Sequence, residues 1–145
     1  MVIPPGRFVA LLFGPPGAGK TTLARTAGVR VYDRDDAEWA QDERRFRPAL
    51  AALAGTPDVQ AVVIRAGSTE AARIRHRRMV GATHAWMLYV DIDTAHKRVK
   101  QRARDPQDHV NVVNWYARYD HGADVPRWPG SWEDALTERV ISRQW

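Results

Sequence analysis

Residues 14–21 read GPPGAGKT and match the pattern G-x-x-x-x-G-K-[ST] at every fixed position. The stretch follows an apolar run over 7–13, which predicts a buried parallel strand, and it opens a helix over 20–27. This order of strand, turn and helix distinguishes the pattern from a chance turn of Gly and Pro. Residues 14–21 therefore predict a phosphate-binding loop and indicate the fold class.

Each fixed residue of the loop has a physical task. The glycines allow backbone angles and close approaches that a Cβ would block, so successive N–H groups can point into one concavity. The Lys20 ammonium reaches the β- and γ-phosphates, and the Thr21 hydroxyl is placed to ligate Mg²⁺. The implied ligands are ATP or GTP, with Mg²⁺. The predicted nucleotide-binding residues of the loop are Gly14, Pro16, Gly17, Ala18, Gly19, Lys20, Thr21 and Thr22.

Length and composition indicate one globular domain over 1–145. The chain has 145 residues and a mass of 16.4 kDa, with 44% hydrophobic and 27% charged residues. It contains no cysteine, which excludes disulfides, thiolate zinc sites and cysteine nucleophiles. We find no apolar run long enough to cross a membrane and no secretion signal at the start. We therefore expect no membrane partner and a cytoplasmic protein, in the host cytoplasm if the gene is viral.

Apolar runs alternate with helical patterns along the chain. Strands are predicted at 7–13, 29–32, 59–64 and 84–90. Helices are predicted at 20–27, 35–53, 70–80, 96–104, 110–119 and 132–142. Strands that alternate with helices imply a parallel sheet. We therefore expect an α/β fold with a parallel sheet of about four to five strands and helices on both faces.

Three carboxylates, Asp33, Asp35 and Asp36, follow the second predicted strand. In an open parallel sheet, the carboxyl ends of the strands face the ligand crevice. A carboxylate there can accept the proton of an attacking hydroxyl or help to hold magnesium. We assign the base to Asp35, with capping of the helix over 35–53 as the alternative. For Asp36, helix capping is the preferred interpretation. For Asp33, a contact with magnesium and the absence of such a contact are equal alternatives.

The order of strand, GPPGAGKTT, helix and strand, followed by the segment YDRDD at 32–36, resembles the 5′-polynucleotide kinase branch of the small P-loop kinases. These belong to the AAA/P-loop NTPase superfamily. In that branch, the first Asp of an Arg-Asp-Asp-like segment is the general base, a role that falls on Asp35. An arginine-bearing lid follows the fourth strand, which places a lid near 96–110 here. The resemblance covers about 7–119, implies a P-loop kinase-like domain, and is compatible with a phage-encoded protein.

Two positions depart from the family pattern. The family often places an arginine after its Arg-Asp-Asp segment to grip substrate phosphate, and Glu38 occupies that position. Arg44, Arg45 or Arg47 would then have to take the place of that arginine. The third strand should end in an acidic residue near the magnesium, but this chain has Arg65 and then Ala66. Magnesium would then rest on Thr21, water, the nucleotide and Asp33.

The positive charge is concentrated in one part of the chain. The net charge is +5 and the pI is about 10.1, but residues 65–104 alone carry a net +7 and the remainder −2. Arg98 and Arg102 are four residues apart and share a helix face, and with Arg104 they could close over the γ-phosphate. A solvated helix face is the alternative for these three. Nucleic-acid contact and a solvated face are equal alternatives for the arginines of the preceding helix, which are Arg73, Arg75, Arg77 and Arg78.

Trp39 lies one turn after Asp35 and is the best candidate for stacking on a base, with packing under a loop as the alternative. The predicted catalytic residues are Lys20, Asp35, Arg98 and Arg102, and Arg104 completes the nucleotide-binding set. The predicted substrate-binding residues are Asp35, Trp39, Arg44 and Arg65.

Three functions fit these residues. The first, which is the preferred interpretation, is transfer of the γ-phosphate of a nucleoside triphosphate to a hydroxyl of a nucleic acid, either a 5′ end or a modified base. The second is phosphorylation of a nucleoside, a nucleotide or another small metabolite. The third is a nucleotide-dependent switch or ATPase that binds a partner. Steep weakening of substrate binding by salt would favour the first over the second. The oligomeric state stays open.

Overall fold

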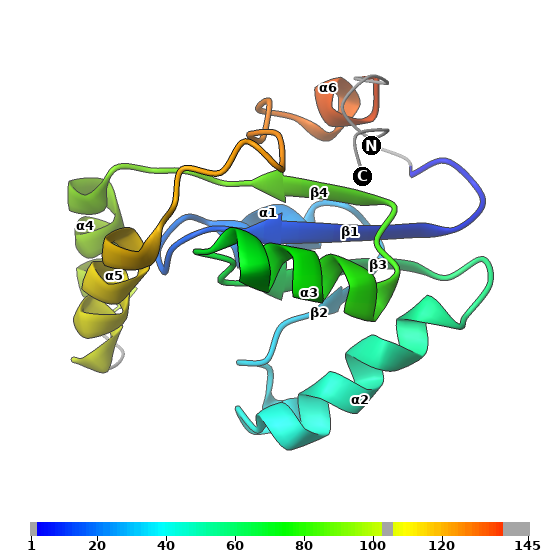
Figure 1. Cartoon of the computed structure of the whole chain (residues 1–145), viewed down its shortest axis with the longest axis horizontal. Helices are drawn as coiled ribbons and strands as arrows, with labels where there is room; N and C mark the ends of the chain where they lie inside the picture. The colour runs from blue at the N-terminus through cyan, green and yellow to red at the C-terminus, as the bar shows by residue number, and fades with distance from the viewer. Residues whose placement is uncertain (1–2, 103–105, 138–145) are drawn as a thin grey trace.

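The computed structural model describes residues 3–102 and 106–137 and contains a four-stranded sheet (Figure 1). The strands are β1 (Phe8–Phe13), β2 (Arg30–Tyr32), β3 (Gln60–Arg65) and β4 (His84–Met87). They lie in the order β2-β3-β1-β4, and every neighbouring pair is parallel. The predicted α/β fold with a parallel sheet is therefore confirmed. Within the described ranges, no helix combines the length and the apolarity needed to span a bilayer.

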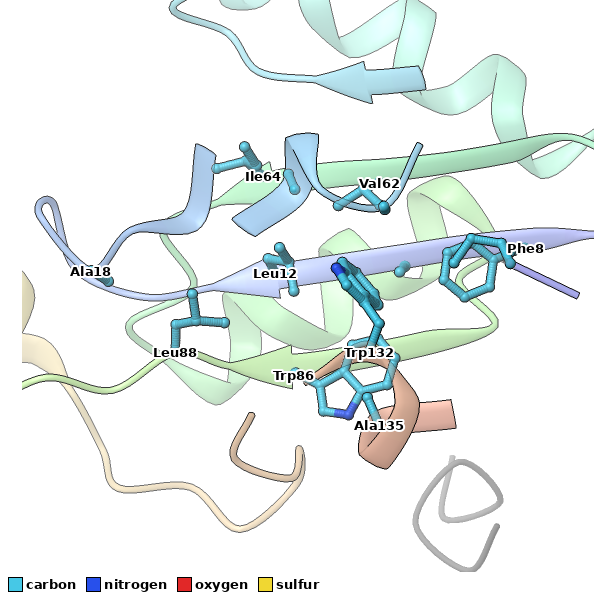
Figure 2. Close-up of a cluster of buried hydrophobic side chains, with 13 residues drawn as sticks. Phe8, Leu12, Ala18, Val62, Ile64, Trp86, Leu88, Trp132 and Ala135 are labelled. Atoms are coloured by element: carbon cyan, nitrogen blue, oxygen red, sulfur yellow. The ribbon is translucent and has the colours of Figure 1, made fainter. Parts of the chain in front are cut away.

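Helices cover both faces of the sheet, as predicted. All six residues of β1 are buried, because successive side chains of this central strand enter opposite faces of the core. On one face, helices α1 (Lys20–Arg25) and α6 (Trp132–Thr137) contribute to a cluster that includes Trp86 and Trp132 (Figure 2). On the other face, α2 (Glu43–Ala54) and α3 (Glu70–Val80) pack their apolar side chains.

Helices α4 (Ile92–Arg102) and α5 (Gln107–Arg118) form a separate pair beyond the end of the sheet where the strands terminate (Figure 1). The two helices pack through Ala95, Val99 and Val112. The indole of Trp115 on α5 donates a hydrogen bond to the Ala66 carbonyl, 2.8 Å away, just after β3. The pair is thereby attached to the edge of the sheet from which the phosphate loop emerges.

The predicted helix over 35–53 is wrong in its first half. A short 3₁₀ helix, η1 (Ala37–Trp39), comes first, and α2 begins only at Glu43. Between them, Ala40 and Gln41 have φ values of 49° and 57°, which interrupt a right-handed helix. The cap of α2 is Asp42, whose carboxylate accepts a hydrogen bond of 2.9 Å from the backbone N–H of Arg44. Asp35 and Asp36 therefore do not cap this helix.

Smaller differences affect the second half of the chain. The fourth strand ends at Met87 rather than at residue 90, and α4 begins at Ile92 rather than at 96. The carboxylate of Asp91 binds the backbone N–H of Thr94 at 2.8 Å, which supports this earlier helix start. Helix α5 begins at Gln107 rather than at 110.

Arg73 on α3 is fully buried, so the suggestion that it contacts nucleic acid is wrong. Its guanidinium pairs with Asp120 at 2.7 Å and Asp124 at 2.8 Å, and it also donates to the Gly67 carbonyl at 2.9 Å. Arg77, one turn later, pairs with the same Asp124 at 3.5 Å. These two arginines attach the segment after α5 to α3 and the loop after β3.

Replacing Arg73 by alanine is expected to lower the free energy of unfolding by about 3–5 kcal/mol, because it leaves carboxylates without their buried partner. Urea unfolding followed by circular dichroism measures the change. Arg75→Ala removes an exposed arginine from the same helix and should change stability by no more than about 0.5 kcal/mol. Equal effects of the two substitutions would contradict a structural role for Arg73.

Candidate active site

The phosphate loop connects β1 to α1 and is packed closely by the elements around it. Gly17 and Gly19 have φ values of 83° and 92°, in the left-handed region that favours glycine. A Cβ on Gly14 would lie 2.5 Å from the Leu88 carbonyl oxygen, and one on Gly17 would lie 2.7 Å from that of Ala95. The exit of β4 and the start of α4 therefore require glycine at these two loop positions.

Lys20 begins α1 and reaches back across the loop. Its ammonium donates hydrogen bonds to the carbonyls of Gly14 and Pro15, the latter at 3.4 Å. Burial lowers the pKa of Lys20 to about 8, the Asp33 carboxylate opposes this shift, and the charge of Arg102 adds to it. The ammonium thus lies against the backbone of the loop, and its contact with the β- and γ-phosphates stays a prediction.

The lowered pKa of Lys20 predicts that nucleotide affinity decreases as pH rises above about 8. Phosphate charges favour the ammonium form, so binding above that pH must be accompanied by uptake of a proton. Titration calorimetry in two buffers of different ionisation enthalpy, at about pH 7 and about pH 9, should detect this uptake only at the higher pH. Lys20→Ala should abolish the difference; a difference that persists in this variant would assign the titration to another group.

The side chains of Thr21 and Asp33 meet beside the loop. The Thr21 hydroxyl donates a hydrogen bond of 2.8 Å to Asp33, and Asp33 is buried at the end of β2. Both side chains offer oxygen atoms, which are the ligands that Mg²⁺ prefers. Across residues 3–102 and 106–137, no group of three or more metal-binding side chains is found.

Asp35 is exposed and follows Asp33 in a hydrogen-bonded turn. The second carboxylate oxygen of Asp33 accepts a hydrogen bond of 3.0 Å from the backbone N–H of Asp35. A chain of contacts therefore joins the loop, through Thr21 and Asp33, to the candidate base. Asp36 lies near Arg25 at 3.5 Å, and burial together with the charge of Asp33 raises its pKa.

Trp39 packs against other aromatic rings of the protein, which is the alternative to stacking on a base. Its ring stacks on Tyr32 at a centroid distance of 6.3 Å and meets the edge of Phe46 at 5.4 Å. This arrangement corresponds to the packing alternative, since both neighbours belong to the core on the α2 and α3 face.

Arg98 on α4 reaches the phosphate loop. Its guanidinium donates hydrogen bonds to the carbonyls of Gly17 at 3.1 Å and Ala18 at 3.3 Å. Arg102 is exposed one turn later, near enough to Lys20 to lower its pKa. Arg104 lies outside the described residues. The structure thus brings two of the three predicted lid arginines to the loop.

The arginine that ends β3 faces α2. Arg65 makes two hydrogen bonds to Glu43, of 2.8 and 3.2 Å, and lies over the Phe46 ring. Arg44 is not part of this arrangement, since its side chain is 94% exposed and lies 3.7 Å from Asp42. Glu43 was missed in the sequence. Glu43 and Arg47 are four residues apart, a spacing that favours an ion pair on one helix face, but nothing in the sequence indicated a contact between Glu43 and Arg65.

No family model matches the chain. Over 49 residues, 30% of its length, it is 51% identical to the molybdenum import ATP-binding protein ModC 1 of Bradyrhizobium diazoefficiens. The match spans only 13% of that protein.

Solved structures resemble the chain over nearly its whole length. A gluconokinase from Sinorhizobium meliloti has a TM-score of 0.57 at 14% identity, covering 93% of this chain and 90% of that one. Shikimate kinase from Acinetobacter baumannii, in complex with shikimate, has a TM-score of 0.52 at 16% identity, covering 92% and 90%. Kti12 from Chaetomium thermophilum, in complex with ADP-AlF3, has a TM-score of 0.53 at 13% identity, covering 92% and 95%. The chain has the fold of the P-loop kinases.

Proposed function

We propose that this protein is a phosphotransferase that moves the γ-phosphate of ATP or GTP to a hydroxyl group. The observation that carries this proposal is the chain of contacts from Thr21 through Asp33 to the turn that presents Asp35. These contacts join the phosphate loop to Asp33, the candidate metal ligand, and to the turn of Asp35, the candidate base. The fold shared with kinases supports the same conclusion.

In the proposed reaction, the acceptor oxygen attacks the γ-phosphorus while Asp35 accepts the hydroxyl proton. A bond forms between the acceptor oxygen and phosphorus, and the bond to the β–γ bridging oxygen breaks, which releases the nucleoside diphosphate. Lys20 neutralises charge that develops on the phosphates, and Arg98 and Arg102 contribute from α4. Mg²⁺, bound through Thr21 and Asp33, would supply further charge neutralisation.

We also propose that residues 1–145 form one kinase domain with an arginine-rich lid near 96–110. In that arrangement Arg98 on α4 would lie against the bound nucleotide. The contacts between Arg98 and the loop carbonyls support this assignment, since they couple α4 to the phosphate loop.

A small molecule is the acceptor that we favour. The preference for nucleic acid rested partly on the arginines of α3, and of these Arg73 and Arg77 are held in ion pairs with Asp124. Nucleic acid remains the second candidate because Arg75 and Arg78 are exposed on the same helix.

Incubation with labelled ATP or GTP and a panel of acceptors tests the proposal. The panel contains 5′-hydroxyl DNA, 5′-hydroxyl RNA, modified-base DNA, nucleosides, sugars and hydroxy acids. Transfer of label to one small acceptor, with a weak dependence on salt, is the expected result. Transfer to a polynucleotide with a steep salt dependence would favour the second candidate. Hydrolysis without any labelled acceptor would indicate a nucleotide switch and contradict the proposal.

A further inference from the structure

The carbonyl oxygen of Ala66, just after β3, accepts two hydrogen bonds. The backbone N–H of Gly14, the first residue of the phosphate loop, donates one of them at 3.1 Å. The indole N–H of Trp115, on α5, donates the other at 2.8 Å. A carbonyl oxygen has two lone pairs, so these hydrogen bonds use its full capacity. The start of the phosphate loop and helix α5 are therefore joined through a single backbone oxygen.

The turn that contains Ala66 also packs directly on the start of the loop. Gly67 has a φ of 58°, and a Cβ at this position would overlap the ring of Phe13, the residue before Gly14. The Gly67 carbonyl accepts a hydrogen bond of 2.9 Å from the buried guanidinium of Arg73. Because the turn contacts Phe13 and is hydrogen-bonded to Gly14, a change in its orientation changes the position of the start of the loop.

The side chain of Trp115 is itself held on several sides. It is buried, stacks on Tyr119 at a centroid distance of 4.6 Å and meets the edge of Tyr116 at 5.1 Å. The Tyr116 hydroxyl donates a hydrogen bond to the Val90 carbonyl, between β4 and α4. These contacts fix the plane of the indole ring, and therefore the direction in which its N–H points.

The same pair of helices contacts the middle of the loop as well. Arg98, on α4, donates hydrogen bonds to the carbonyls of Gly17 and Ala18, and α4 packs on α5. The pair thus holds the phosphate loop at its first residue through Trp115 and near its middle through Arg98. A phosphate loop binds its ligand through backbone N–H groups that point into one concavity. Holding those groups in place before the ligand arrives lowers the entropic cost of binding.

We infer that Trp115 is a positioning residue for nucleotide binding. Its indole N–H fixes the Ala66 carbonyl and, through it, the orientation of Gly14 and of the phosphate loop. Without this N–H the loop would spend a smaller fraction of time in its binding orientation, and the apparent nucleotide affinity would fall by that fraction. This inference rests on the proposed function, since it states how the nucleotide site of that function is prepared.

Trp115→Phe tests the inference, because it keeps a buried aromatic ring and removes the N–H. Titration calorimetry of the full chain with ADP and Mg²⁺ should show affinity weakened by about three- to tenfold, the effect of one lost hydrogen bond on a conformational equilibrium. Urea unfolding of the variant measures how much stability is lost with the indole, so that a loss of affinity can be separated from a loss of folding.

Trp132→Phe is the matched control. Trp132 and Trp115 are both 4% exposed, and the Trp132 indole donates a hydrogen bond of 2.9 Å to the Thr26 hydroxyl. Its ring lies 6.3 Å, centroid to centroid, from that of Phe8, at the opposite end of β1 from the loop. The control loses the same kind of buried hydrogen bond, but its ADP affinity should change by less than about twofold. Equal ADP affinities of the two variants, or no binding of ADP by the parent chain, would overturn the inference.

The parent chain allows a second measurement that does not depend on how well a variant folds. If the Trp115 hydrogen bond favours nucleotide binding, bound nucleotide must strengthen that hydrogen bond to the same extent. In NMR, ADP with Mg²⁺ should therefore slow the deuterium exchange of the Trp115 indole N–H more than that of Trp132. An equal effect of ADP on the two indole signals would overturn the inference.

The outcome is separable from that of the proposed function. Nucleotide binding requires no turnover, so a chain whose ADP affinity depends on Trp115 but which transfers no label contradicts only the phosphotransferase assignment. Transfer of label together with an unchanged ADP affinity in Trp115→Phe contradicts only the role of Trp115. In an active enzyme, Trp115→Phe should raise KM for the nucleotide more than it lowers kcat, because saturating nucleotide restores the binding orientation of the loop.

Discussion

Replacing Lys20 by alanine is expected to lower nucleotide turnover by about a thousandfold, the effect of removing a preorganised charge from a phosphate-transfer site. Lys20 projects from the first turn of α1 and closes over the loop through the Gly14 and Pro15 carbonyls. The same ammonium would neutralise charge as the γ-phosphate is transferred. Its partly buried position strengthens that interaction, because the local dielectric constant is lower than in water.

Release of labelled phosphate, or its transfer to an acceptor, measures the effect of Lys20→Ala. Lys97→Ala provides the matched control, since Lys97 is exposed on α4 and the substitution removes the same charge. Thermal unfolding should show that both variants are folded. Turnover of a folded Lys20→Ala variant within about tenfold of the parent would refute the role of Lys20.

The phosphate loop and the strands could be predicted because their signals are local. The apolar run that forms β1 is contiguous, and residues 14–21 contain every glycine and the lysine that the loop requires. The topological rule that the ends of parallel strands gather at one edge of a sheet placed Asp33 near the ligand crevice, but its hydrogen bond with Thr21 was not predicted.

The start of α2 could not be predicted in the same way. Ala40 and Gln41 adopt positive φ values, although neither residue type favours them. Such a conformation is imposed by tertiary packing, in which Trp39 is held between Tyr32 and Phe46. Several aspartates before the helix were plausible caps, and only the backbone geometry selects Asp42.

The arginines were the least predictable part of the site. Arg73 reaches partners 47 and 51 residues away, and Arg65 reaches one 22 residues away. In a sequence, such residues look like solvated surface charge, because nothing local distinguishes a paired arginine from an exposed one. The concentration of positive charge over 65–104 therefore overstated the charge available to a polyanion.

Replacing Asp35 by asparagine is expected to reduce phosphate transfer by about a hundredfold to ten-thousandfold while nucleotide binding stays nearly unchanged. The change keeps the size and the polar character of the side chain but removes the carboxylate that we propose as the base for the hydroxyl proton. The turn itself should persist, because it depends on the backbone N–H of residue 35 and the carboxylate of Asp33. Single-turnover transfer measures the loss, and titration calorimetry measures nucleotide affinity.

Asp36→Asn is the matched control for Asp35→Asn. Asp36 is the adjacent carboxylate, it lies near Arg25, and burial raises its pKa. The control should retain transfer within about tenfold of the parent, because the proposed base is intact. A loss confined to Asp36→Asn would move the base to that residue. Full transfer by both variants would mean that the acceptor hydroxyl needs no carboxylate base, which metaphosphate-like transition states permit when the acceptor is already ionised.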